Sequence, residues 1–197
     1  NLHASYLPKY RGAAPIQWAL INGESQTGLT TFKLAEKVDT GNIYLQKKVE
    51  IFPEDNFGTL HDKLSELGAD IVLETVDLIE RGSFELQKQD DSLATPAPKI
   101  TKDICKIDWN KSAIEIHNLI RGFSPYPAAF FSFNDKVIKI YQSEVVNRND
   151  LKPFDIEQNK NELIIGCGKS AIRILQLQQE GKKRMGIEEF LRGFSFQ

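Results

Sequence analysis

The stretch that decides the fold opens the chain and reads NLHASYLPKYRGAAP over residues 1–15. Asn1 and His3 are two positions apart, so in a strand their side chains project from the same face. A carboxylate, Asp39, follows in the turn VDTG at residues 38–41. An imidazole that titrates near neutrality, an amide donor and a carboxylate suit acyl transfer to an amine, because they can move protons and stabilise an oxyanion. Asn1, His3 and Asp39 are therefore a candidate catalytic set.

Each member of this set also has a purely structural interpretation. A lone histidine is more often a core or surface residue, which is how we interpret His61 and His117. Aspartate is common in glycine-containing turns for conformational reasons. The residues alone leave both interpretations open. Because the chain starts on a candidate catalytic residue and not on Met, we expect a fragment or a processed chain whose preceding segment is missing.

The bulk composition is that of a globular protein: 197 residues, 41% apolar and 26% charged, enough for one large or two small domains. No stretch approaches the roughly 18 apolar residues of a membrane span, so we expect no membrane association. Cys105 and Cys167 are far apart and belong to no CxxC or Cys/His pattern. This argues against structural zinc and is typical of a reducing compartment.

The net charge of −2 hides an asymmetry between the two halves of the chain. Residues 1–97 carry 9 Lys+Arg against 15 Asp+Glu, whereas residues 98–197 carry 16 against 12. The difference is either chance variation between solvated faces or the mark of a C-terminal half that meets a polyanion.

The first part of the chain predicts a mixed α/β domain. A short helix is expected at residues 14–23, strands at 28–34 and 43–51, and a long amphipathic helix at 59–81 that ends at Gly82. These are too few strands for a complete doubly wound domain. We therefore expect further strands and helices upstream.

The second part predicts a small β-rich domain after a linker at residues 84–102. Ser112 and Glu115 form a capping box that begins a short helix. Two hairpins over residues 130–141 and 162–177 indicate a closed or partly open β-barrel, followed by a short helix at 187–192. The predicted division is thus 1–83, 84–102 and 103–197.

The opening motif, continued to Gln17, resembles the signature of the folate-dependent formyltransferases. The likeness continues through QTG at 26–28, VDTG at 38–41, APKI at 97–100, IDW at 107–109, IRGFSPYP at 120–127, LQLQ at 175–178 and GKKRM at 181–185. The opening motif is shared across the family, whereas the later stretches resemble its members that act on methionyl-tRNA. The resemblance implies an α/β Rossmann-like catalytic domain, of which this chain holds the second part, followed by an OB-like barrel.

The resemblance also implies an activity. It is the transfer of a formyl group from 10-formyltetrahydrofolate to the α-amino group of methionyl-initiator tRNA, for translation initiation, by a monomer in the bacterial cytoplasm or an organellar matrix and without a metal. Asn1, His3 and Asp39 match the catalytic residues of the family. The folate-binding stretch corresponds to Ser5, Tyr6, Leu7 and Pro8, and Tyr6 stands where the family usually has Leu.

Basic residues are the candidates for contact with tRNA phosphates. They are Lys9 and Arg11 beside the motif, and Lys169, Arg173, Lys182, Lys183 and Arg184 in the second domain. The alternative for each is a solvated surface charge. We expect the aromatic residues of the second domain to form barrel core and not base-stacking platforms; they are Phe130, Phe131, Phe133 and Phe154.

Two other functions stay open. A formyltransferase could act on a small amine, such as a nucleotide sugar or glycinamide ribotide, but that substrate gives no reason for an OB-like second domain that ends in GKKRM at residues 181–185. The chain as it stands could also be a noncatalytic remnant that only binds RNA.

Overall fold

The computed structural model of the protein describes residues 1–82 and 84–196. Residue 83, where the first predicted domain ends, and residue 197, where the last one ends, lie outside the described residues. The chain forms two compact units, Asn1–Ile100 and Thr101–Gln197.

The N-terminal unit is built on a three-stranded antiparallel sheet in the order β1 (Leu2–His3), β2 (Gln26–Phe32) and β3 (Ile43–Glu50). His3 pairs with Thr30 of β2, so the first strand places the opening motif on an edge of the sheet. The two longer strands lie where the apolar pattern predicts them. These strands pair antiparallel, and together with two helices they make this unit the mixed α/β domain that the sequence predicts.

Two helices accompany the sheet, α1 (Pro15–Ile21) and α2 (Phe57–Arg81). Proline at the first position of α1 sacrifices no hydrogen bond, because that N–H has no partner within a helix. Asn56 caps α2 reciprocally with Thr59, so the helix begins two residues earlier than its apolar pattern predicts. It ends, as predicted, at Gly82 in the left-handed conformation (φ 64°).

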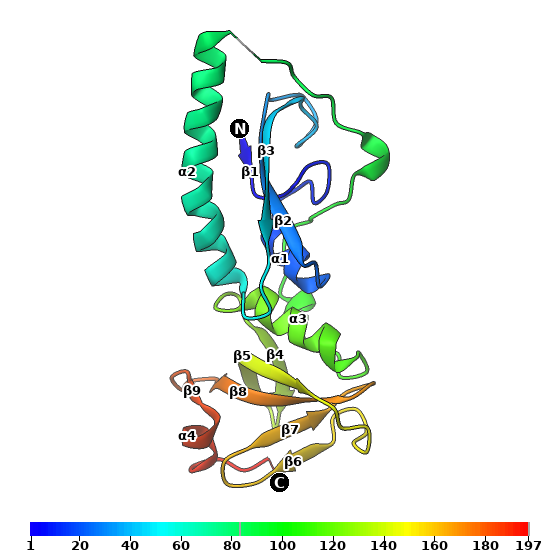
Figure 1. The fold of residues 1–197 in the computed structure, drawn as a ribbon. Helices are drawn as coiled ribbons and strands as arrows, with labels where there is room; N and C mark the ends of the chain where they lie inside the picture. Colours follow the sequence, from blue (N-terminus) through cyan, green and yellow to red (C-terminus); the bar gives the residue numbers. More distant parts are fainter. Residues whose placement is uncertain (83, 197) are drawn as a thin grey trace. The chain divides into compact units, whose positions relative to one another are not determined.

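One face of α2 packs on the sheet, as Figure 1 shows. Its buried positions recur at intervals of three or four residues, which is the helical period: Leu60, Leu64, Gly68, Ile71 and Thr75. Leu60, Leu64 and Ile71 join Leu29 and Val49 of the strands in the apolar core of this unit.

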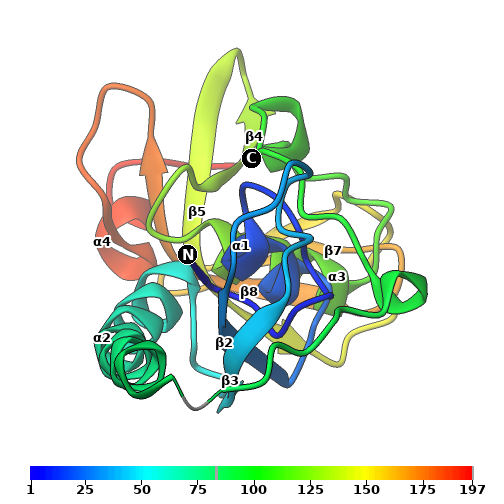
Figure 2. The same cartoon turned by 90° about the horizontal axis from the view of Figure 1, so that it is seen from above.

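The segment expected to be a linker is part of this unit up to residue 100. It forms an antiparallel bridge between Gln87 and Ile43 and a parallel bridge between Pro96 and Arg11, and Ala97 is fully buried in the core. It contains the 3-10 turn η1 (Asp91–Leu93) and passes the sheet on the side away from α2 (Figures 1 and 2). Backbone pairing thus anchors a stretch whose composition is typical of a linker.

The C-terminal unit is a curled antiparallel sheet with α3 (Ala113–Phe123) packed on it (Figure 1). The strands follow the order β4-β5-β8-β7-β6, with β9 beside β8. Their bounds are β4 (Ala129–Phe133), β5 (Lys136–Val146), β6 (Ile156–Gln158), β7 (Leu163–Gly166), β8 (Ala171–Gln179) and β9 (Met185–Gly186). Within the part of the chain that the structure describes, the pairing runs from β4 to β6 without closing. Of the two predicted forms, the half-open barrel is therefore the one observed.

Both α-helices described in this unit begin where the local sequence pattern predicts. Ser112 and Glu115 form the predicted reciprocal cap of α3, and α4 (Ile187–Leu191) lies within the predicted range. The turn η2 (Asp103–Cys105) and the strand β6, which has only three residues, have no clear counterpart in the sequence pattern.

Three of the four aromatic residues expected in the barrel core, Phe131, Phe133 and Phe154, join one cluster of rings, and Phe130 on β4 is half-buried. Phe131 is buried and contacts the rings of Trp109, Phe154 and Phe196, and Phe133 contacts Phe196. Phe154 is 38% exposed, so it covers the rim of the cluster and not its centre. In neither unit is any described helix long and apolar enough to cross a membrane.

Candidate active site

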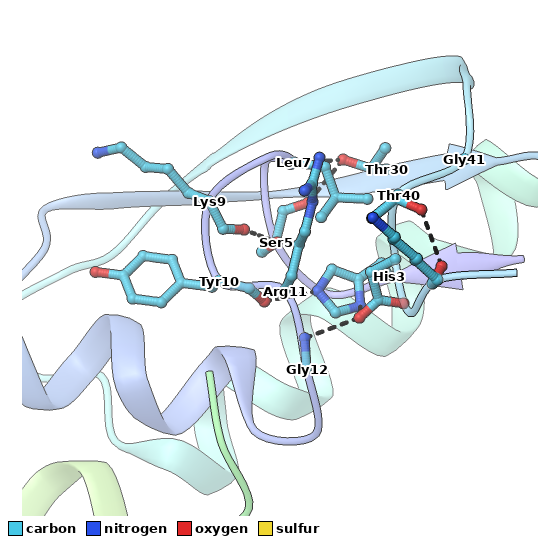
Figure 3. A network of polar contacts seen from close by, with 12 residues as sticks. His3, Ser5, Leu7, Lys9, Tyr10, Arg11, Gly12, Thr30, Thr40 and Gly41 are labelled. Atoms are coloured by element: carbon cyan, nitrogen blue, oxygen red, sulfur yellow. Dashed lines mark hydrogen bonds and ion pairs between the residues drawn. The ribbon is translucent and has the colours of Figure 1, made fainter. Parts of the chain in front are cut away.

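The imidazole of His3 lies buried on β1, and each of its nitrogens faces an oxygen atom (Figure 3). Nε2 lies 2.8 Å from the carbonyl oxygen of Tyr10, and Nδ1 lies 3.6 Å from Oδ2 of Asp39. A carbonyl oxygen only accepts hydrogen bonds, so Nε2 carries a hydrogen and donates it to Tyr10. In the neutral ring the free lone pair is then on Nδ1, the nitrogen that faces Asp39, and a proton taken up by the ring arrives there.

The carboxylate of Asp39 is fixed by a main-chain donor. The amide N–H of Gly12 donates to its Oδ2 at 2.8 Å, a contact that Figure 3 draws. Gly12 has φ +128° and a Cβ there would lie 2.5 Å from the carbonyl oxygen of Ala97, so only glycine brings this N–H so close. Asp39 itself has φ 54°, a left-handed conformation that is uncommon outside glycine.

The opening loop is organised around the hydroxyl of Thr30 on β2. Thr30 Oγ1 donates to the carbonyl oxygen of Ser5 (2.8 Å) and accepts from the N–H of Leu7 (3.1 Å). Gln46 of β3 donates to the Leu7 carbonyl oxygen at 2.7 Å, and Leu7 is buried against Phe32 and Ile43. These contacts give residues 5–8 a defined shape beside His3.

The predicted folate-binding residues differ in accessibility. Ser5 is fully buried and its hydroxyl donates to the carbonyl oxygen of Lys9 at 2.6 Å, and Leu7 is core. Tyr6 is 36% exposed, with the Lys48 ammonium 5.5 Å from its ring centroid. Of these residues, Tyr6 therefore presents the largest side-chain surface to a ligand.

Asn1 lies at the exposed start of β1, where its main chain pairs with Phe32 in both directions (2.9 Å each). Strand alternation places its side chain on the same side as that of His3. The fold thus brings His3 and Asp39 together directly, whereas Asn1 precedes β1, two residues before His3.

The two basic residues beside the motif have different surroundings. Arg11 is directed inward: its Nε and Nη2 donate to Oε1 of Gln89 (3.0 and 2.7 Å), and Nη2 also pairs with Asp91 at 2.8 Å. Only 15% of the Arg11 side chain is exposed, against 55% for Lys9, whose Nζ lies 3.6 Å from Glu24. A tRNA contact remains a prediction for both, and Lys9 is the more accessible of the two.

Tyr10, whose carbonyl oxygen accepts the hydrogen bond from His3, also lines a surface pocket. The pocket measures about 340 Å3 and is lined by Lys9, Tyr10, Trp18, Asn22, Glu24, Thr95, Pro96 and Pro98. The Tyr10 phenol donates to Glu24 at 2.8 Å and accepts from Asn22 at 3.2 Å. Burial, with the carboxylate of Glu24 beside it, raises the pKa of Tyr10 to about 12.

The predicted tRNA-binding cations of the C-terminal unit lie on and around β8. Arg173 pairs with Glu144 and Glu162 (3.0 and 2.5 Å), which raises its pKa, and Lys183 pairs with Glu189 at 3.4 Å. The guanidinium of Arg184 lies 4.2 Å from the ring centroid of Tyr141, and its Nε donates to Gln176.

Lys169 and Lys182 are exposed. The accessible positive charge of this group therefore lies mainly in the β8–β9 region and in the turn before β8.

Three residues that shape the site are not marked by the sequence pattern: Tyr10, Thr30 and Gln89. The carbonyl oxygen of Tyr10 accepts the hydrogen bond from His3. Tyr10 acts through its main chain, which the residue type does not reveal. Gln89 lies in a polar run that reads as linker. For residues 1–82 and 84–196, no group of three or more His, Cys, Asp or Glu is arranged to hold a metal ion.

Comparison with known proteins identifies the class of this site. The model of the formyl transferase family matches residues 1–76, and the model of the formyl transferase C-terminal domain matches residues 99–195. The chain belongs to the formyl transferase family.

Its relatives are more specific. The chain is 47% identical over 194 residues to the methionyl-tRNA formyltransferase of Caldanaerobacter subterraneus, and 50% identical over 193 residues to that of Thermodesulfovibrio yellowstonii. Each match covers 98% of this chain and 62–63% of the relative, so the chain spans a little under two thirds of their length.

A solved structure of the N-formyltransferase from Helicobacter canadensis, in complex with folinic acid and dTDP-3-aminofucose, is similar in fold. Its TM-score is 0.75 at 26% identity, and the match covers 90% of this chain and 65% of that one.

Proposed function

We propose that this protein transfers the formyl group of 10-formyltetrahydrofolate to the α-amino group of methionyl-initiator tRNA. The main structural support for this proposal is the buried His3, whose Nε2 donates to the Tyr10 carbonyl oxygen and whose Nδ1 faces Asp39. The identity to methionyl-tRNA formyltransferases over 98% of the chain supports the choice of substrate. A related enzyme solved with folinic acid supports a folate as the formyl donor.

The proposed chemistry gives each of the three residues one task. The amine of methionyl-tRNA attacks the formyl carbon, a C–N bond forms, and the carbonyl oxygen becomes an oxyanion to which the Asn1 amide donates. Nδ1 of His3 receives the proton that the amine loses, directly or through a water bound to Asp39. The bond between the formyl carbon and N10 of the folate then breaks as the oxyanion collapses, and N10 takes up the proton that Nδ1 of His3 had received, which returns the ring to its neutral form.

Asp39 assists by its charge. A carboxylate 3.6 Å from Nδ1 stabilises the imidazolium form and keeps the ring oriented while the proton is transferred. Ser5, Tyr6, Leu7 and Pro8 border the folate, with Tyr6 offering an exposed ring to it.

For tRNA binding, we infer that the half-open barrel is the OB-like domain of the protein. Its cations Lys169, Arg173, Lys182, Lys183 and Arg184, together with Lys9 beside the site, would neutralise backbone phosphates and make binding salt-dependent. Arg11 would contribute less to this binding, because its guanidinium already bonds Gln89 and Asp91. We further propose that it serves translation initiation in a bacterial cytoplasm or an organellar matrix as a monomeric enzyme, and the bacterial relatives support the bacterial setting.

The test is a transfer assay with two acceptors. Methionyl-initiator tRNA and a dTDP-amino sugar are compared with 10-formyltetrahydrofolate as donor, and the His3→Ala variant serves as the blank. Transfer to the tRNA supports the proposal. Preference for the amino sugar, which the bound ligand of the Helicobacter canadensis enzyme makes the second candidate, would contradict it. Tight tRNA binding by the chain without transfer would instead support a noncatalytic RNA-binding role.

A further inference from the structure

The side-chain amide of Gln89 is buried, with 6% of the residue exposed, and all its hydrogen-bonding positions are occupied. Nε2 donates to the carbonyl oxygens of Asp39 and Gly41, both at 2.8 Å. Oε1 accepts from Nε and Nη2 of Arg11 at 3.0 and 2.7 Å. An amide has two N–H groups and two lone pairs. Gln89 therefore joins Arg11 to the turn of Asp39, and its amide has no unused donor or acceptor.

Only one orientation of this amide is compatible with its neighbours. Turned over, its oxygen would face two carbonyl oxygens and its NH2 group would face the guanidinium of Arg11. Arg11 is itself held, because its side chain pairs with Asp91 and its main chain bonds to Thr95 and Ala97 (2.9 and 2.7 Å). The surrounding contacts therefore dictate which end of Gln89 points at the turn.

Asp39 needs such support because of its backbone. A φ of 54° is disfavoured for a residue other than glycine, so contacts from outside the turn must hold that conformation. At Gly41 an added Cβ would lie 1.6 Å from the carbonyl oxygen of Lys33, so the turn is also tightly packed there. Gln89 bonds the carbonyl groups at both of these positions.

Two contacts of Asp39 lead back to the adjacent residues Arg11 and Gly12. The Gly12 N–H binds the carboxylate, and Arg11, the residue before Gly12, holds the main chain of Asp39 through Gln89. Displacement of the turn would change the distance from Oδ2 to the Gly12 N–H and to Nδ1 of His3 together.

We propose that Gln89 is a positioning residue: its amide fixes the turn of residues 39–41 and thereby aims the Asp39 carboxylate at His3. The inference rests on the proposed function of Asp39 in formyl transfer. It assigns a role in the active site to a segment whose sequence resembles a linker.

Two substitutions separate the parts of this role. Gln89→Glu keeps an oxygen for Arg11 but replaces the donor to Asp39 and Gly41 by a second oxygen. Gln89→Met keeps the length of the side chain and removes both sets of bonds. The matched control is Gln158→Met in the C-terminal unit, where Gln158 likewise joins two main-chain groups, the carbonyl oxygen of Phe194 (3.4 Å) and the N–H of Phe196 (2.8 Å).

The first measurement is independent of activity. The amide hydrogen of Gly12 reports on the Asp39 carboxylate, and its exchange rate and chemical shift are followed by NMR in the folded protein. We expect Gln89→Glu to speed its exchange about tenfold or more, since the bond to Oδ2 is then made only part of the time. Unchanged Gly12 exchange and chemical shift in both Gln89 variants would overturn the inference.

The second measurement is kcat for formyl transfer, in the wild-type and in the Asp39→Asn background. A misplaced catalytic group can cost about a hundredfold, so we expect Gln89→Glu to lower kcat at least tenfold with little change in KM. In the Asp39→Asn background the same substitution should change kcat less than twofold, because the two residues act as one unit. Losses that multiply would overturn the inference, since a general structural role is additive in free energy.

The two measurements also separate this inference from the function on which it rests. Faster Gly12 exchange with an unchanged kcat would show that Gln89 fixes the turn of residues 39–41, and it would contradict the catalytic role of Asp39.

Discussion

Nδ1 of His3 and Oδ2 of Asp39 lie 3.6 Å apart, while the same oxygen accepts the Gly12 N–H at 2.8 Å. The carboxylate is therefore held by the main chain and not by the imidazole. Because Nε2 of His3 is bound to the Tyr10 carbonyl oxygen, the ring can exchange a proton only at Nδ1. This geometry provides a base whose acquired charge is stabilised by a carboxylate that is already in place.

The first prediction concerns this pair. His3→Ala and Asp39→Asn should each lower kcat about a hundredfold or more, whereas folate binding changes less, since both groups act on the proton and not on the bound donor. Steady-state transfer kinetics and a folate titration measure the two effects. His61→Ala, at an exposed histidine of α2, is the control with unchanged kcat. Near-normal turnover in both site variants would rule out the assignment.

The second prediction separates Lys9 from Arg11. Removing an exposed cation that meets a phosphate should reduce the slope of log K against log salt by about one. We expect this for Lys9→Ala and for Lys182→Ala. Arg11→Ala should instead lower kcat, with a small change in slope, because its guanidinium is committed to Gln89 and Asp91. Salt titrations of tRNA binding provide the measurement, and a binding constant independent of salt would show that these charges are merely solvated.

The third prediction concerns stability against pH. Burial, with the nearby Arg121 charge, lowers the pKa of His117, whose Nδ1 also contacts Ser143; Glu144 acts in the opposite direction. The unfolded state then binds a proton at higher pH than the folded state, so the free energy of unfolding should fall as the pH drops below about 6.5.

Urea unfolding at pH 7.5 and 5.5 measures this effect. His117→Gln should reduce the loss at low pH, whereas His61→Gln, at an exposed site, should not. Equal losses in the wild type and the His117 variant would contradict the prediction.

The fourth prediction concerns the turn of the site. Gly41→Ala places a methyl group against the Lys33 carbonyl oxygen, so the main chain must move; we expect a cost of about 3 kcal/mol and a loss of transfer activity. In Gly82→Ala, at the end of α2, the added methyl group has no atom within 4 Å, so only the φ of 64° disfavours alanine there. We expect this substitution to lower the free energy of unfolding by about 1 kcal/mol. Chemical denaturation compares the two, and equal costs would show that the turn adapts.

Local structure was predictable where its cause is local. The caps at Ser112 and Gly82, the helical period of α2 and the hairpins depend on residues within a few positions of one another. The very short strands β1 and β9 are stabilised mainly by pairing with distant strands, so no local pattern marks them.

The sequence by itself determined the family likeness, the candidate set Asn1, His3 and Asp39, and the order of the longer helices and strands, because these reside in residue type and short-range spacing. Only the tertiary structure decided which nitrogen of His3 faces Asp39, since a main-chain carbonyl of Tyr10 occupies the other. It also decided that Arg11 bonds to Gln89, 78 positions away. Contacts of such sequence separation, made in part by main-chain atoms, form only when the chain folds back on itself.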